Sequence, residues 1–214
     1  MNDDYLEPYR RARAELGDDF GVTLWARPET QTVRFDVFRD LAPFAGRRVL
    51  DAGCSRGDFA AYLIERDVAY AAFTGVDGVP EVIADARGRG LARASFVVAD
   101  FVREPGSLGA DVPEAERPEV TVLSGTLNTM DWDTARAVLD AAWAGCGHTL
   151  LFNFLSDRCG ADAPPQKDPA RRLPADRVLD WAWSQTWDVV FRQDYFAHGH
   201  DATVRMRRPG GNGR

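Results

Sequence analysis

A glycine-punctuated turn between an apolar strand and a helix constrains the fold of this chain more than any other feature. The strand ends in Val49-Leu50-Asp51, the turn runs from Ala52 to Gly57, and Phe59 opens a helical stretch. Glycines let the backbone approach a ligand closely, and the free amide groups of a helix start bind polar or anionic groups. The segment therefore predicts a ligand-binding loop at the end of a strand.

Two further acids stand at the ends of strand-like segments. Asp77 follows the apolar run 70–76, and Asp100 follows the run 94–99. From residue 47 onward the chain alternates strand and helix, which implies a mostly parallel sheet with right-handed crossovers. Because ligands bind beyond the carboxyl ends of such strands, Asp51, Asp77 and Asp100 together predict a nucleoside-binding edge.

On these residues the sequence resembles the class I S-adenosylmethionine (SAM)-dependent methyltransferases. Their first motif is an acid followed by three alternating glycines, and here Asp51 to Gly57 matches it with Ser55 in place of the middle glycine. The segment 76–81 is similar to the second motif, with Gly78 where a larger apolar residue often packs on adenine. The segment 98–101 matches the third. The resemblance covers roughly residues 45 to 155.

The predicted fold is α/β: a Rossmann-like, doubly wound, mostly parallel seven-stranded sheet with an antiparallel C-terminal hairpin. We expect one SAM-binding domain over residues 1–208, made of an N-terminal helical cap (1–44) and a Rossmann-like core (45–208). Residues 209–214 are expected to form a disordered tail. The tryptophans of a predicted helix over 175–187 are expected to belong to the core.

The resemblance implies SAM as the cofactor and S-adenosylhomocysteine (SAH) as its product, and it assigns roles to particular residues. Asp77 would accept hydrogen bonds from both ribose hydroxyls, and Asp100 would accept one from the adenine amino group, with Phe101 covering the ring. Asp51 would orient the ammonium group. The predicted cofactor-binding residues are Asp51, Ala52, Gly53, Cys54, Ser55, Gly57, Asp77, Gly78, Asp100, Phe101, Ser124, Gly125, Arg34 and Trp25.

The segment before the first motif adds the last two of these residues. Leu24 to Arg27 and the Gln31-x-x-Arg34-Phe35 pattern are similar to small bacterial methyltransferases. On that resemblance Arg34 or Gln31 would bind the cofactor carboxylate, with Trp25 shielding it. An exposed helical arginine and a packing tryptophan are the equally open alternative.

Methyl transfer is an in-line displacement at a sulfonium, so the protein mainly positions the reactants and excludes water. A base is needed only where the nucleophile arrives protonated. His198 and His200, in the turn between the last two predicted strands, are the candidate catalytic residues, although turn histidines are commonly only solvated. The predicted substrate-side residues are Tyr5, Tyr9, Asn128, Trp132 and Asn153.

Composition narrows the class of acceptor. The 214 residues carry a net charge of −7, which argues against nucleic acid or an anionic membrane as the main partner. Three cysteines without metal-ligand spacing predict a reducing compartment and no metal site. With an acidic, non-apolar start and no apolar run of membrane-spanning length, we expect a cytoplasmic protein acting on a small molecule. The sequence does not indicate an oligomeric state.

Two other readings stay open at this point. The departures at Ser55 and Gly78 allow a SAM-binding protein of the same fold that does not methylate, and that assists another reaction or acts as a partner. A nicotinamide-dependent reductase would require Gly-x-Gly-x-x-Gly, whereas the chain offers Gly53-x-x-x-Gly57. The methyltransferase interpretation is therefore preferred.

Overall fold

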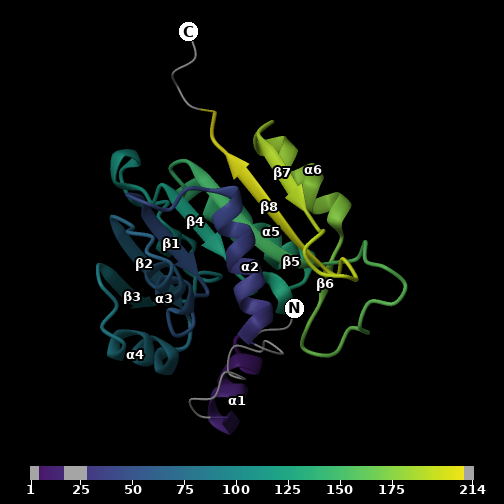
Figure 1. The fold of residues 1–214 in the computed structure, drawn as a ribbon, viewed down its shortest axis with the longest axis horizontal. Helices are drawn as coiled ribbons and strands as arrows, with labels where there is room; N and C mark the ends of the chain where they lie inside the picture. Colours follow the sequence, from purple (N-terminus) through teal and green to yellow (C-terminus); the bar gives the residue numbers. More distant parts are fainter. Residues whose placement is uncertain (1–4, 17–27, 210–214) are drawn as a thin grey trace.

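The computed structural model describes residues 5–16 and 28–209. Trp25 and nearly all of the predicted C-terminal tail lie outside these residues. Within the described chain, a single sheet runs through the molecule and helices cover both of its faces (Figure 1). Its strands follow the order β3-β2-β1-β4-β5-β8-β7, with β6 paired to β5 off this path.

Five strands of the sheet are parallel to one another. Each of these strands is a short apolar run. Helices cover both faces of the sheet, and such coverage favours apolar side chains on both faces of a strand over an alternation of apolar and polar residues. β1 lies between β2 and β4, and all three run in the same direction, so their carboxyl ends meet at one edge of the sheet. The first motif follows β1 and the second motif follows β2, so both motifs lie at this edge. The parallel strands are β1 (Arg48–Ala52), β2 (Ala72–Asp77), β3 (Ala94–Val98), β4 (Val120–Leu123) and β5 (Thr149–Ser156).

The C-terminal part of the sheet is antiparallel. β8 (Asp201–Arg207) pairs antiparallel with β5 on one side and with β7 (Val189–Arg192) on the other. The short β6 (Arg172–Leu173) adds two parallel pairs to the end of β5. Seven strands thus form the continuous path, which confirms the predicted sheet and its C-terminal hairpin.

Two apolar layers hold the helices on the sheet. On one face, aromatic side chains such as Phe38, Phe59 and Phe73 pack α2 (Pro28–Leu41), α3 (Asp58–Glu65) and α4 (Pro80–Gly88). On the other face, α5 (Trp132–Gly145) and α6 (Ala175–Gln185) pack against β4, β5 and β8. Three short 3₁₀ helices complete the described chain: η2 (Pro105–Leu108), η3 (Glu114–Glu116) and η4 (Thr126–Thr129).

The N-terminal helix α1 (Glu7–Leu16) lies beyond the carboxyl ends of the parallel strands (Figure 1). Leu6, just before it, forms a small apolar cluster with Val79 and Val82. The predicted N-terminal cap thus contains the helices α1 and α2 among its described residues, and α1 covers the edge where a ligand would bind.

The prediction that the tryptophans of the 175–187 segment belong to the core is wrong for two of three. Trp181 is 5% exposed, but Trp183 and Trp187 are 56% and 78% exposed. α6 packs only one face on the sheet, and Trp187 lies beyond its end. None of the described helices is long and apolar enough to cross a membrane.

Candidate cofactor site

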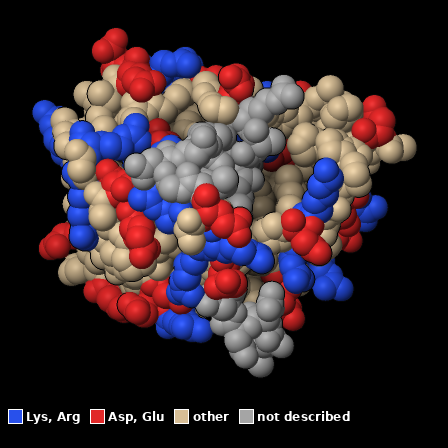
Figure 2. Space-filling model, turned by 90° about the horizontal axis from the view of Figure 1, so that it is seen from below, with Lys and Arg blue, Asp and Glu red and all other residues tan. Residues whose placement is uncertain are grey.

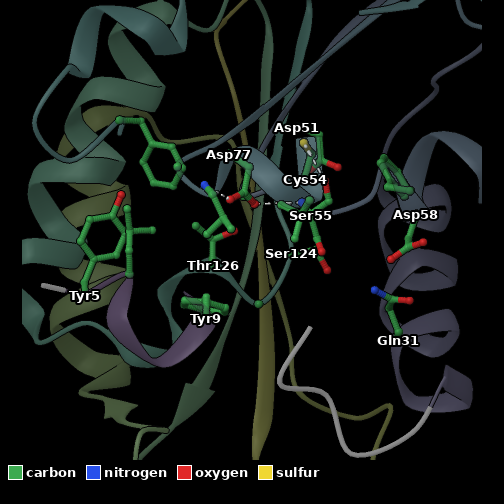
Figure 3. A pocket seen from close by; sticks show the side chains of 18 of the residues that line it. Tyr5, Tyr9, Gln31, Asp51, Cys54, Ser55, Asp58, Asp77, Ser124 and Thr126 are labelled. Atoms are coloured by element: carbon green, nitrogen blue, oxygen red, sulfur yellow. Dashed lines mark hydrogen bonds between the residues drawn. The ribbon is translucent and has the colours of Figure 1, made fainter. Parts of the chain in front are cut away.

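A cavity opens at the carboxyl edge of the parallel strands, between α1 and α2. Its empty volume, including the open mouth, is about 780 Å³. Figure 3 shows Tyr5 and Tyr9 on the α1 side, Gln31 on the α2 side, and Asp77, Ser124 and Thr126 between them. The lining residues are Tyr5, Leu6, Tyr9, Gln31, Phe35, Asp51, Gly53, Cys54, Ser55, Asp58, Phe59, Asp77, Gly78, Val79, Val82, Phe101, Ser124, Gly125 and Thr126.

The loop after β1 requires glycine at position 53. Gly53 has a φ of 78°, in the left-handed region that side chains disfavour. A Cβ atom there would also lie 2.4 Å from Thr126 Oγ1. Thr126 cannot easily give way, because its hydroxyl donates to the Ala52 carbonyl oxygen at 2.6 Å. The bare backbone at Gly53 therefore forms part of the cavity floor.

Ser55 adopts the backbone conformation that the missing glycine would favour. Its φ is 47°, and its amide donates to Asp77 Oδ2 at 2.9 Å. The amide of Val79 donates to Asp77 Oδ1 at 3.0 Å. These bonds fix the carboxylate of Asp77 between the first and second motifs. Since each carboxylate oxygen can accept a second hydrogen bond, Asp77 can still accept from a ligand.

Two acids, Asp51 and Asp58, lie at the end of the cavity near the first motif, next to Asp77. Asp51 is 3% exposed, and its Oδ1 has no hydrogen-bond partner among the described residues. Burial raises the pKa of Asp51 well above its ordinary value, and the charges of Asp77 and Asp58 raise it further. Burial also raises the pKa of Asp77. A buried, unpartnered carboxylate among like charges favours a cationic ligand group, which would relieve both costs.

The opposite end of the cavity is apolar. Leu6, Val79, Val82 and Phe101 line it, and each is at most 5% exposed. The ring of Tyr5 packs against Phe101 with 6.3 Å between the ring centroids. Asp77 lies between this apolar end and the acids. The cavity therefore suits a ligand with a cationic polar end, a hydroxyl-bearing middle and a flat apolar end.

Asp100, predicted to bind adenine, does not line the cavity. Its Oδ1 accepts hydrogen bonds from the Tyr5 hydroxyl at 2.8 Å and from the amide of Val102 at 3.2 Å. Burial and the carboxylate of Asp100 raise the pKa of Tyr5, so the phenol stays protonated and donates. Asp100 thus holds α1 over the cavity, and its neighbour Phe101 is the residue that lines it.

Arg34, predicted to bind the cofactor carboxylate, also lies outside the cavity lining. Its Nε donates to Asp201 Oδ2 at 2.7 Å, and its Nη1 donates to the Thr30 carbonyl oxygen at 2.7 Å. Arg34 and Asp201 are both buried, and the guanidinium lies 4.8 Å above the Phe196 ring centroid. Arg34 therefore ties α2 to β8, and Gln31, three residues earlier on the same helix, is the residue that lines the cavity.

Two predicted substrate residues brace the loops around the cavity from behind. Asn153 is fully buried, and its Oδ1 accepts from the amide of Gly125 at 2.6 Å. Asn128 Oδ1 accepts from the amide of Leu155 at 3.2 Å. Both side chains join the loop after β4 to the end of β5, so they position Ser124 and Gly125 without lining the cavity.

Of the remaining catalytic and substrate candidates, one lines the cavity and three do not. Tyr9 lines the cavity, and burial raises its pKa to about 12, so its phenol is a hydrogen-bond donor at neutral pH. Trp132 packs against the core at the start of α5. His198 Nδ1 lies 3.3 Å from Asp162 Oδ2, and the ring of His200 stacks on Phe196. Neither histidine is among the residues that line the cavity.

Motif reasoning thus brought together the strand-end part of the lining. Of the predicted cofactor residues, the structure places nine on the cavity, and these are Asp51, Gly53, Cys54, Ser55, Asp77, Gly78, Phe101, Ser124 and Gly125. Ala52 and Gly57 belong to the same loop but lie outside the lining. Motif reasoning missed Asp58 and the apolar contributions Leu6, Phe35, Phe59, Val79 and Val82. The helical spacing of the apolar residues Leu6 and Tyr9 is a sequence signal that indicates which face of the N-terminal segment lines the cavity.

Comparison with known proteins is informative at the level of structure. No family model and no curated protein matches the sequence. The fold is similar to magnesium protoporphyrin IX methyltransferase (ChlM) from Synechocystis PCC 6803 with bound SAH: the TM-score is 0.65 at 15% identity, over 97% of this chain and 96% of that chain. It is similar to the DhpI-SAM-HEP complex, with a TM-score of 0.69 at 15% identity, over 98% and 100% of the two chains.

A third similar structure is the small RNA methyltransferase HEN1, with a TM-score of 0.65 at 12% identity. There the match covers 84% of this chain but 25% of the other. The strand order, the antiparallel end of the sheet and these matches show that the chain has the fold of the class I SAM-dependent methyltransferases.

Proposed function

We propose that this protein is a SAM-dependent methyltransferase that acts on a small molecule. The observation that carries the proposal is the order of groups along the cavity: the buried Asp51 with Asp58 beside it, then Asp77 held by two backbone amides, then an apolar end. The ammonium and sulfonium, the ribose and the adenine of SAM have the same order. Fold similarity adds support, because ChlM and DhpI structures contain SAH or SAM.

Each part of the chain has a defined task in this proposal. Asp51 holds the ammonium group, because its buried Oδ1 needs a donor and a cation. Asp77 accepts the ribose hydroxyls with the lone pairs that Ser55 and Val79 leave open. Gly53 and Gly125 line the cavity without a side chain, so the backbone can approach the ligand there. When bound, SAM supplies an electrophilic methyl group on a sulfonium.

The chain's own contribution to the reaction is orientation and exclusion of water. α1 and α2 cover the cavity from two sides, and Gln31 and Tyr9 reach it from these helices. With its pKa raised to about 12, Tyr9 can orient an acceptor by donating a hydrogen bond. His198 and His200 stay candidates for a base only if the acceptor reaches the β7–β8 connection.

Three observations support a small acceptor over RNA. The ChlM and DhpI matches cover 97% and 98% of this chain, whereas the matches to HEN1 and to the methyltransferase domain of bacterial CtHen1 each cover 84% of it. The net charge is −7. On the face seen from below, basic and acidic side chains are interspersed among the visible residues, with no extended basic strip (Figure 2). RNA binding depends on such strips for phosphate contacts.

A methyl-transfer assay with labelled SAM tests the proposal. The protein is incubated with a small-molecule extract in one reaction and with total RNA in another, and label is followed into each fraction. We expect label in the small-molecule fraction alone. Label in RNA would overturn the small-acceptor proposal. Tight SAH binding with no transfer to any fraction would favour the non-methylating protein of the same fold.

The site residues also give an expectation about metal ions in this assay. Among the residues that the structure describes, no three His, Cys, Asp or Glu side chains are grouped so that they could hold a metal ion. We therefore expect transfer to continue in the presence of a chelator. Loss of transfer that added magnesium restores would contradict this expectation.

A further inference from the structure

Gly78 leaves a gap beside Asp77, and the side chain of Leu6 fills it. A Cβ atom built on Gly78 would lie 2.7 Å from Leu6 Cδ1 and 3.1 Å from Leu6 Cδ2. Gly78 is not one of the glycines with positive φ, so its backbone does not require glycine. The lack of a side chain at position 78 is therefore explained by the nearby side chain of Leu6 and not by backbone strain.

The gap lies at the apolar end of the cavity. Leu6, Val79 and Val82 form one buried cluster, and all three line the cavity with Phe101. If Asp77 binds the ribose, as the proposed function requires, the base attached to that ribose extends toward this end. An aromatic base gains most from contact with buried apolar side chains.

We propose that Leu6 is a cofactor-binding residue that packs on the adenine of SAM in place of a side chain at position 78. The contact then comes from the residue just before α1, 72 positions earlier in the chain, and Gly78 makes room for it. The N-terminal helix is thereby part of the cofactor site as well as its cover. This inference rests on the proposed function, because it requires an adenosine ligand on Asp77.

Two anchors hold Leu6 in this place. Before the helix, the Tyr5 hydroxyl donates to Asp100 Oδ1 at 2.8 Å. Farther along α1, Arg13 Nη2 lies 2.9 Å from Asp85 Oδ2 on α4. Asp100 is thus a positioning residue, which acts on the base through Tyr5 and the neighbouring Leu6.

A double-mutant cycle with SAH as the probe tests the inference. Binding of SAH by calorimetry is measured for the wild type, Leu6→Ala, Gly78→Leu and the double variant Leu6→Ala/Gly78→Leu. We expect Leu6→Ala to weaken binding about tenfold, since it removes apolar contact with the base. Gly78→Leu alone should also weaken it, because the new side chain meets Leu6. The double variant should recover most of the wild-type affinity, because the side chain now comes from the end of β2.

Controls separate this role from general support of α1. Leu41→Ala removes the same side chain from α2, where Leu41 packs on the core away from the cavity, and should leave SAH affinity unchanged. Unfolding temperatures without ligand show whether each variant is folded. If Leu6 only supported α1, Gly78→Leu would not rescue Leu6→Ala.

The outcomes distinguish the two proposals. Failure of the wild type to bind SAH overturns the proposed function, and this inference with it. Wild-type binding with equal affinity in Leu6→Ala overturns only the role of Leu6. Additive losses in the double variant also overturn it, whereas recovery of affinity supports it.

Discussion

The cavity has two walls that are held in different ways. The strand-end wall, formed by Asp51, residues 53–55, 77–79 and 124–126, is held mostly by hydrogen bonds in which at least one partner is a main-chain group. The amide of Gly53 donates to the Val76 carbonyl oxygen at 2.8 Å, and that of Ser55 donates to Asp77. The helical wall, formed by Tyr5, Leu6, Tyr9, Gln31 and Phe35, is attached through side chains that meet from distant parts of the chain.

This difference explains what each wall contributes. Main-chain geometry after a strand depends on local sequence, so the strand-end wall has a fixed shape suited to binding the charged and hydroxyl groups of a ligand. The helical wall depends on the pairs Tyr5–Asp100, Arg13–Asp85 and Arg34–Asp201, which join residues 95, 72 and 167 positions apart. The sequence of the helical wall can therefore vary independently of the motifs. This wall covers the cavity and supplies apolar contacts to it.

The largest expected effect is on the helical wall. Arg34→Met leaves Asp201 buried without its cation, and breaking a buried pair in this way costs about 3–5 kcal/mol of unfolding free energy. The control is Arg39→Met on the same helix, where the Arg39–Asp36 pair is 3.5 Å long and its side chains are more than a third exposed. That loss should stay below about 1 kcal/mol. Equal losses in denaturant unfolding would contradict the role of Arg34 as a clamp.

The next effect concerns the strand-end wall. Asp77→Ala removes the acceptor of the ribose hydroxyls and of two backbone amides, and should weaken SAH binding about a hundredfold. Calorimetric titration measures the change. Asp180→Ala, at an exposed position on α6, is the matched control and should bind SAH like the wild type. Retained affinity in Asp77→Ala would mean that the ligand does not lie along this wall.

A pair of glycines sharpens the account of the strand-end wall. Gly53 and Gly46 have similar φ values of 78° and 71°, but a Cβ at Gly46 meets nothing within 4 Å. Gly46→Ala should cost about 1 kcal/mol of unfolding free energy from the backbone alone. Gly53→Ala should cost about 2 kcal/mol more, because its Cβ meets Thr126 Oγ1. Equal costs would show that the Thr126 contact relaxes freely.

The last expected effect is a pH dependence of SAM binding. Asp51 and Asp77 have folded-state pKa values above the ordinary value of 3.8, so the folded protein binds protons that the unfolded chain has released. As the pH rises from 3.8 through the raised pKa values, these two groups therefore destabilise the unliganded protein. A cationic ligand requires both carboxylates ionised, so its binding releases protons.

SAM affinity should consequently fall as the pH drops through the raised pKa values, by up to about tenfold per pH unit for each proton released. Calorimetry in buffers of different ionisation enthalpy measures the protons released. In Asp51→Asn the release should be smaller. Binding with no proton release anywhere in this window would contradict a cation at the acidic end.

The same division of walls decides what could be predicted from the sequence. The sheet, its hairpin and the residues of the first two motifs could be predicted from the sequence. The signals for them are the alternation of strand and helix segments, the turn glycines and the acids at the strand ends, and all of these are local. They could not place Arg34 or Asp100, whose partners Asp201 and Tyr5 lie far away in the sequence. Because Arg34 and Asp100 bind these partners, neither side chain lines the cavity. The predicted burial of Trp183 and Trp187 was wrong for a related reason, since tertiary packing decides which tryptophans are covered.

The central claim is that this cavity binds SAM, and calorimetric titration of the wild-type protein with SAM, SAH and NADH tests it most directly. The account predicts saturable binding of SAM and SAH at one site per chain and no binding of NADH. Binding of NADH with no affinity for SAH would contradict it, and would mean that the acids, Asp77 and the apolar end serve a dinucleotide.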